Sequence, residues 1–321
     1  MSVPTPPWNV PETAAVPARS SLDRLPPQVF FLVSAVFHYV GPSLAVLLFA
    51  QVNVLGVAWL RIAGAAVVFA VWRRPWRLFF SRGKEGHPAG RLDSASRRTL
   101  IALGVVLAVM NTAFYLAVDR LPLSTVGAIE FLGTVILAAA GARTKRNAVA
   151  LAITVAGVAA ITSIRMAGQP LGFVFAFGNC VLFMLYVMLG HRIANRRPHR
   201  ARDQGSGANP PGGIDLLAAS MLFAALVVTP IGLADALPTF TRPDLLLAGV
   251  GVGLCSSVIP YVTDQLAMAR LSRATFALML ALLPVFATII GAIVLRQVPT
   301  PRDLAGIALV AVGVAIHTEG K

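Results

Sequence analysis

Glu130 is an acidic side chain near the middle of an apolar stretch, Arg120–Gly141. If this stretch is a helix, the carboxyl group lies about 15 Å from one end, at a rise of about 1.5 Å per residue. An ionised carboxylate at that depth in a bilayer is costly, so it should be protonated, paired or exposed to water. Such a group could carry a proton across a membrane, or bind the ammonium group of an amino-acid-like substrate. The structural alternative is a protonated glutamate that bonds to a neighbouring helix.

Polar side chains also recur on one face of another stretch. Asn111, Tyr115 and Asp119 follow one another at intervals of four residues, a spacing that places them on one face of a helix. The matching positions 150 residues later, with their polar neighbour, are Tyr261, Gln265, Ala269 and Asp264. Because such a stripe would be costly against lipid, we expect it to line a substrate cavity or, alternatively, to bond helix to helix. Asp119 and Asp264 are expected nearer the ends of their spans and less buried, and Asp264 is a second candidate for proton coupling.

Four further polar residues are candidates for the lining of a cavity. Arg61 lies well inside an apolar stretch, where it could pair with Glu130, bind a substrate carboxylate, or extend its charged end to the membrane surface. His38 could carry a proton, since histidine changes charge near neutral pH, although a single histidine in a membrane helix is more often a packing residue. Asn179 and Tyr186 are seven residues apart and therefore share one helix face.

The composition indicates that a membrane surrounds these residues. Of the 321 residues, 57% are hydrophobic and 12% are charged, with a mean hydropathy of +0.76, whereas soluble domains are roughly 25% charged. The apolar runs have the ~20 residues that a helix needs to cross a hydrocarbon core of ~30 Å. We therefore predict an all-α integral membrane protein with ten transmembrane helices. They lie at 28–49, 52–72, 99–118, 121–142, 147–164, 170–191, 214–235, 244–268, 271–295 and 301–318.

The chain reads as two related halves. The layout of the Glu130 stretch returns at Arg270–Gly291, where Leu280 takes the place of the acid. Most of the 27 Lys and Arg residues fall in alternate loops that lie inside if both termini are cytoplasmic, as the positive-inside rule requires. Five spans per half is an odd number, so the second half should cross the membrane in the opposite direction to the first. We predict two inverted five-helix repeats, at 28–165 and 166–321, after a disordered cytoplasmic tail at 1–27.

Several other classes of function find no support in the sequence. The net charge of +14 does not indicate nucleic-acid binding, because the basic residues lie between apolar runs rather than on a solvated basic domain. Cys180 and Cys255 both lie inside apolar spans, which does not support a disulfide scaffold or a zinc site. A zinc-protease motif, a phosphate-binding loop and a nucleophile elbow are absent from the sequence. We therefore expect no cofactor, no metal site and no enzyme activity.

Five stretches resemble a known family, the EamA-type transporters of the drug/metabolite transporter superfamily, and within it the bacterial threonine/homoserine exporter group. They are LRIAGAAVVFAVWRRPWRL at 60–78, ALGVVLAVMNTAFYLAV at 102–118, GAIEF at 127–131, SSVIPY at 256–261 and RLSRATFALML at 270–280. The resemblance covers nearly all of 28–318 and implies ten spans in two inverted halves, proton-coupled export of amino acids or related metabolites, and a role for Glu130. Two positions depart from the exporter group: Leu283 stands where an acid tends to precede Pro284, and Thr134 replaces an expected proline.

Sequence and resemblance together predict a multi-pass exporter of the bacterial inner membrane that moves amino acids or related small metabolites by proton antiport. Its partners would be the substrate, protons and the lipid bilayer, and a homodimer is left open. The first alternative is a drug or lipid-carrier transporter of the same fold, although an aromatic content of 8% weighs against large planar drugs. A non-transporting scaffold is a weaker alternative.

Overall fold

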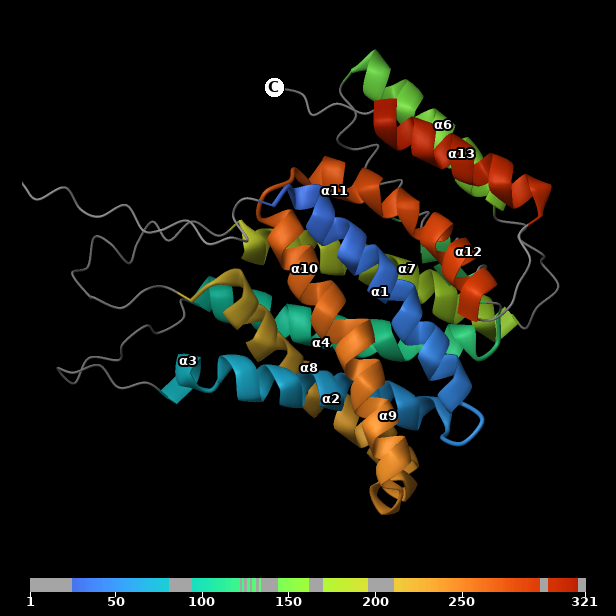
Figure 1. Cartoon of the computed structure of the whole chain (residues 1–321). Coiled ribbons are helices and arrows are strands. Elements are labelled where there is room, and N and C mark those ends of the chain that lie inside the picture. Colours follow the sequence, from blue (N-terminus) through green and yellow to red (C-terminus); the bar gives the residue numbers. More distant parts are fainter. Residues whose placement is uncertain are drawn as a thin grey trace, which may run out of the picture.

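A computed structural model describes residues 25–80, 94–121, 144–161, 170–195, 211–294 and 300–316, together with positions 123, 126, 127, 129, 130 and 133. Every element in these ranges is a helix, as Figure 1 shows. Nearly all of the predicted tail at 1–27 and most of the predicted fourth span at 121–142 lie outside the described residues.

Seven described helical segments are long and apolar enough to cross a membrane. Four are single helices: α1 (Pro27–Leu48), α2 (Val54–Arg73), α4 (Ser94–Val118) and α7 (Pro170–Ala194). Three are composite: α8 (Gly213–Ala236) with η2 (Leu237–Thr241), α9 (Pro243–Gly253) with η3 (Leu254–Val258) and α10 (Ile259–Met268), and α11 (Arg273–Met279) with η4 (Leu280–Leu282) and α12 (Leu283–Val294). A short α3 (Arg77–Phe80) follows α2. The chain is thus a multi-pass helical membrane protein.

Two shorter helices occupy the positions of the predicted fifth and tenth spans. They are α6 (Lys145–Ile161), with 17 residues, and α13 (Pro301–Ile316), with 16. The residues that follow each of them lie outside the described ranges, so the full ten-span count stays a prediction. The described part of the structure confirms the helical class and, apart from the fourth, fifth and tenth spans, the positions of the predicted spans to within about five residues.

Local sequence signals set where several helices begin. Asn53 caps α2, because its side chain accepts a hydrogen bond from the backbone N–H of Leu55 at 3.2 Å. Ser272 caps α11 in the same way, accepting from the N–H of Thr275 at 3.1 Å. Proline stands in the first turn of α1 and α9, where its missing N–H costs nothing because the first helical N–H groups have no partner within the helix.

The predicted eighth span is one continuous path with a change of helix type in its middle. Between α9 and α10 lies η3, a π-helical turn at Leu254–Val258. Pro260 follows it and has no N–H to donate to the carbonyl of Ser256, four residues earlier. The backbone of η3 therefore has a carbonyl group available for a partner on another helix.

The helix contacts in the predicted first half, 28–165, have counterparts in the predicted second half, 166–321. The first helix of each half packs on the third helix of the other, as α1 does on α10 and α7 on α4. The second helix of each half also packs on the third of the other, as α2 does on α9 and α8 on α4. Equivalent helices pair with each other, α2 with α8 and α6 with α13. In Figure 1 the last pair lies side by side at one edge of the bundle.

Candidate functional site

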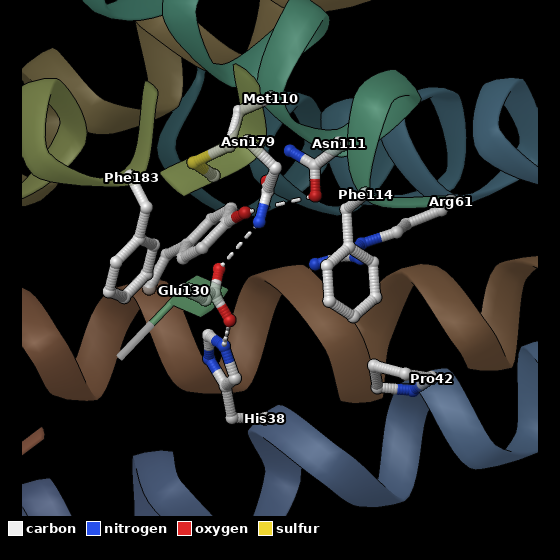
Figure 2. Close-up of a pocket in the computed structure, with 10 residues that line it drawn as sticks. His38, Pro42, Arg61, Met110, Asn111, Phe114, Glu130, Asn179 and Phe183 are labelled. Carbon is white, nitrogen blue, oxygen red and sulfur yellow. Dashed lines mark hydrogen bonds and ion pairs between the residues drawn. The ribbon is translucent and has the colours of Figure 1, made fainter. Parts of the chain in front are cut away.

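A pocket lies where α1, α2, α4, α7 and α10 meet, and the segment that carries Glu130 contributes to its wall (Figure 2). The space between its atoms is about 270 Å³, including the part open to solvent. The lining combines an acid, a guanidinium group, two amides, an imidazole and several apolar groups. These residues are His38, Pro42, Arg61, Met110, Asn111, Phe114, Glu130, Asn179, Phe183 and Tyr261.

Glu130 is held in the pocket by side chains from two helices. Its exposed fraction is 4%. One carboxyl oxygen, Oε1, accepts a hydrogen bond from Nδ2 of Asn179 on α7 at 3.0 Å. The other, Oε2, lies 3.9 Å from Nε2 of His38 on α1 and accepts no hydrogen bond from any described residue. Figure 2 shows the carboxyl group between the two side chains. The second oxygen therefore has capacity for a proton or for a donor on a ligand.

Close packing places the Glu130 segment between α1 and α7. A Cβ atom added to Gly127 would lie 2.9 Å from the hydroxyl oxygen of Tyr39 on α1. A Cβ atom added to Gly133 would lie 2.8 Å from Cγ of Met184 on α7. Real Cβ atoms do not approach other atoms so closely, so side chains larger than hydrogen would displace the segment and its carboxyl group.

Arg61 is held by the π-helical turn η3. Its exposed fraction is 5%. Nη2 donates to the carbonyl oxygen of Ser256 at 2.8 Å, and Nε donates to the hydroxyl of Ser257 at 3.0 Å. The first acceptor is the carbonyl that Pro260 cannot use. The guanidinium carbon also lies 5.3 Å from the ring centroid of Tyr115, within the range of a cation–π contact.

The two halves meet through a hydrogen bond between matching positions. The hydroxyl of Tyr261 donates to Oδ1 of Asn111 at 3.2 Å, and the two residues are 150 positions apart. Nδ2 of Asn111 donates back to the carbonyl of Leu107 in its own helix at 2.6 Å. Both residues line the pocket, so the polar stripes of the third and eighth spans converge here.

The structure brings six of the predicted site residues to the pocket, namely His38, Arg61, Asn111, Glu130, Asn179 and Tyr261. Tyr115 contacts the pocket indirectly, through Arg61. Gln265 instead points to α7, where Nε2 lies 3.4 Å from the carbonyl of Gly190. Tyr186 and Asp264 are hydrogen-bonded to each other, between the tyrosine hydroxyl and Oδ2 at 2.8 Å.

The two aspartates that were expected near span ends differ in burial. Asp264 has an exposed fraction of 2%, so the expectation that it is less buried is wrong: α10 packs against α1, α7 and α8 along this part of its length. Asp119 is exposed, and its carboxylate lies 3.2 Å from Nη1 of Arg120. The stripe predicted from Asn111 therefore reaches the surface at its last residue.

The sequence reasoning missed the apolar part of the lining, which includes Met110, Phe114 and Phe183. Helical spacing could have found them, because Phe114 lies three residues after Asn111 and Phe183 lies four residues after Asn179. It also missed Ser257, which holds Arg61. In the described part of the chain, no group of three His, Cys, Asp or Glu residues is arranged to hold a metal ion.

The pocket holds an acid and a guanidinium group that are not paired with each other. Glu130 forms no ion pair with Arg61 among the described residues, and the hydrogen bonds of Arg61 go to neutral oxygens. Buried charges of this kind are expensive unless a partner compensates them. A ligand with an ammonium group at one end and a carboxylate at the other would compensate both.

Comparison with known proteins agrees with this geometry. Residues 206–318 match the EamA-like transporter family. The match assigns this part of the chain to the EamA-like transporter family. Members of this family are transporters, so the chain is a transporter and not an enzyme.

Among curated relatives, the threonine/homoserine exporter RhtA of Escherichia coli (strain K12) is 28% identical over 299 residues, covering 90% of this chain and 91% of the relative. The exporter of the same name from Salmonella typhimurium (strain LT2) is 27% identical over 277 residues, covering 84% and 82%. A crystal structure of another protein covers 90% of this chain and 96% of its own, with a TM-score of 0.60 and 16% sequence identity. This last likeness shows a shared fold.

Proposed function

We propose that this EamA transporter exports amino acids or related small metabolites across the bacterial inner membrane by proton antiport. In this proposal the ten spans form two inverted five-helix repeats with both termini in the cytoplasm. The matched packing of the two halves and the alternate distribution of basic loops support that arrangement.

The observation that carries the proposal is an acid and a guanidinium group in one pocket with no ion pair between them among the described residues. Glu130 has an unpartnered Oε2 that can receive the ammonium group of an amino acid. Arg61 has a charge that no described carboxylate neutralises, and a guanidinium group suits recognition of a substrate carboxylate. The exporters RhtA are named for threonine and homoserine, both of which carry these two groups.

The carboxyl group of Glu130 also gives protons a place in the proposed transport cycle. Protons enter the scheme through Glu130, because a carboxyl group that binds either a proton or a substrate ammonium exchanges one for the other.

An efflux assay tests the substrate class. Cells that overproduce the chain are loaded with labelled threonine or homoserine, with the matching amine that lacks the carboxylate, or with the hydroxy acid that lacks the amino group. We expect efflux of the amino acids to exceed that of either truncated analogue by at least about tenfold. Arg61→Gln should abolish this preference for the carboxylate, whereas the control Arg120→Gln, outside the pocket, should keep it. Efflux of planar drugs in place of amino acids would overturn the proposal.

A further inference from the structure

Asn111 holds its side-chain amide in one orientation. Its Nδ2 donates to the carbonyl oxygen of Leu107 on the same helix at 2.6 Å, and its Oδ1 lies 3.2 Å from the hydroxyl of Tyr261. A carbonyl oxygen has no proton and can only accept, so the NH₂ end of the amide must face Leu107. The carbonyl end of the amide therefore faces Tyr261, and Asn111 offers that tyrosine only an acceptor.

This orientation determines how the hydroxyl group of Tyr261 can bond to a ligand. A tyrosine hydroxyl has one proton, and here that proton is donated to Oδ1 of Asn111. Tyr261 is buried on α10 and lines the pocket. Toward a ligand in the pocket, its oxygen is therefore a hydrogen-bond acceptor and not a donor.

Asn179 on α7 supplies a second acceptor by the same reasoning. Its Nδ2 donates to Oε1 of Glu130 at 3.0 Å, and an ionised carboxylate can only accept. The other end of the amide, Oδ1, is buried and has no hydrogen-bond partner among the described residues. A buried acceptor without a donor costs free energy, and Asn179 lines the pocket. A donor group on a ligand would remove that cost.

The lining of the pocket thus suits a ligand with more than one donor group. In the proposed function Glu130 binds the ammonium group and Arg61 binds the carboxylate, but all amino acids share these two groups. A hydroxyl on the side chain would donate to Tyr261, whereas an apolar side chain would leave the tyrosine oxygen without a donor from the ligand. A side-chain carboxylate would place acceptors against acceptors, which is unfavourable.

We propose that Tyr261 selects amino acids whose side chain carries a hydroxyl group, and that Asn111 is the positioning residue that fixes the direction of this selection. The substrate hydroxyl donates its proton to the Tyr261 oxygen in a hydrogen bond, and no covalent bond changes. The two residues are 150 positions apart, at matching points of the internal repeat, so the selection takes place where the two halves meet. This inference rests on the proposed function and narrows its substrate class.

Equilibrium binding to the purified full chain in lipid nanodiscs tests the selection without any transport. The ligands are threonine and valine, which have the same shape but carry a hydroxyl and a methyl group respectively. We expect the Kd of valine to exceed that of threonine by at least about fivefold in the parent, the effect of one hydrogen bond. Tyr261→Phe should raise the Kd of threonine to that of valine and leave the Kd of valine within about twofold. Damage to the fold would weaken both ligands.

Tyr39→Phe is the matched control for the loss of a tyrosine hydroxyl. Tyr39 is buried on α1, its hydroxyl has no hydrogen-bond partner among the described residues, and it is not part of the pocket lining. The control should keep the parent's ratio of the two Kd values.

Asn111→Leu tests the direction of the hydrogen bond. It removes the acceptor that takes the Tyr261 proton, so the hydroxyl becomes free to donate to a ligand. O-methylthreonine has a side-chain oxygen that can only accept. We expect its Kd relative to that of threonine to fall by at least about fivefold from the parent to Asn111→Leu.

Equal Kd values for threonine and valine in the parent would overturn the selection, because the acceptors would then serve the ammonium group that both ligands share. An unchanged ratio in Tyr261→Phe would overturn it as well. If Tyr261→Phe binds neither ligand, Asn111→Leu decides, and an unchanged preference between O-methylthreonine and threonine refutes the inference. A parent that binds neither amino acid would refute the proposed function itself, whereas binding without discrimination refutes only the selection by Tyr261.

Discussion

Glu130 and Arg61 lie in one pocket, and no ion pair joins them among the described residues. Each is anchored by neutral groups: the amide of Asn179 for the acid, and the oxygens of Ser256 and Ser257 for the cation. Such anchors fix the position of a charged group without cancelling its charge, which is the condition for strong binding of an oppositely charged ligand group.

Replacement of Arg61 by lysine tests, at the residue scale, whether the planar guanidinium group with its two hydrogen bonds to η3 is needed. Lysine keeps the charge but cannot donate to the Ser256 carbonyl and the Ser257 hydroxyl with one planar group. Hydrogen bonds to charged groups are worth about 1.5–3 kcal/mol, so we expect the KM for the amino acid to rise by about tenfold or more. The measurement is initial-rate transport in proteoliposomes. Arg120→Lys serves as the control, and a KM within twofold of the parent for Arg61→Lys would refute the assigned role.

The sequence was a good guide to individual polar residues and a poor guide to their partners. Depth in an apolar stretch was sufficient to select Glu130 and Arg61, because a buried charge needs a reason. The sequence did not show whether Glu130 and Arg61 pair with each other. The partners of Arg61 are serines of η3, which lie about 195 residues away in the chain. Local sequence patterns carry no information at that separation.

At the scale of elements, the pocket depends on the junction between α1 and η3. Gly41 on α1 packs directly against Ser256, and a Cβ added there would lie 2.7 Å from the Cα atom of Ser256. This contact lets α1, which carries His38, approach the turn that holds Arg61. The glycine is needed here for the close approach of two backbones.

Gly41→Ala should therefore destabilise the protein. Overpacking of a close contact costs about 1–3 kcal/mol, so we expect the melting temperature in detergent to fall by several degrees. Gly251→Ala is the matched control, because a Cβ at that position on α9 would meet no atom within 4 Å. Equal melting temperatures for the two variants would show that α1 and η3 are not in tight contact.

Element positions were predictable because hydropathy marks each span directly, and α8 (Gly213–Ala236) lies within a residue of its predicted bounds of 214–235. The change to a π-helical turn at Leu254–Val258 was not predictable from the sequence. Pro260 does indicate that the helix is irregular nearby, since proline removes a backbone hydrogen bond. Whether the helix then forms a kink or a π-helical turn depends on which group donates a hydrogen bond to the freed carbonyl oxygen. Here that donor is Arg61.

At the scale of the whole molecule, the exchange symmetry of the helix contacts bears on topology. If two five-helix units pair as equals, α2 with α8 and α6 with α13, and each has an odd number of spans, they cross the membrane in opposite directions. The basic loops then fall on one side. The succession of apolar helices was predictable at this level because hydropathy marks them, whereas the pairing of helices from distant parts of the chain was not.

Cysteine labelling tests this topology. Cys180 and Cys255 are replaced by alanine, and single cysteines are introduced at Lys145, at the start of α6, and at Thr241, between α8 and α9; both sites are exposed. We expect a membrane-impermeant maleimide to label the Thr241 site in intact spheroplasts and the Lys145 site only after permeabilisation. Labelling of both sites from the same side would contradict the inverted arrangement.

Proton-driven transport by the purified chain tests the central claim most directly. Proteoliposomes loaded with labelled threonine are given a pH gradient, and efflux is compared for the parent, for Glu130→Gln and for the control Asp119→Asn. We predict that the parent and the control respond to the gradient and that Glu130→Gln loses the response by at least about tenfold, because glutamine keeps the size and the Asn179 partner but cannot bind a proton. Transport by Glu130→Gln that follows the gradient as well as the parent does would contradict the account.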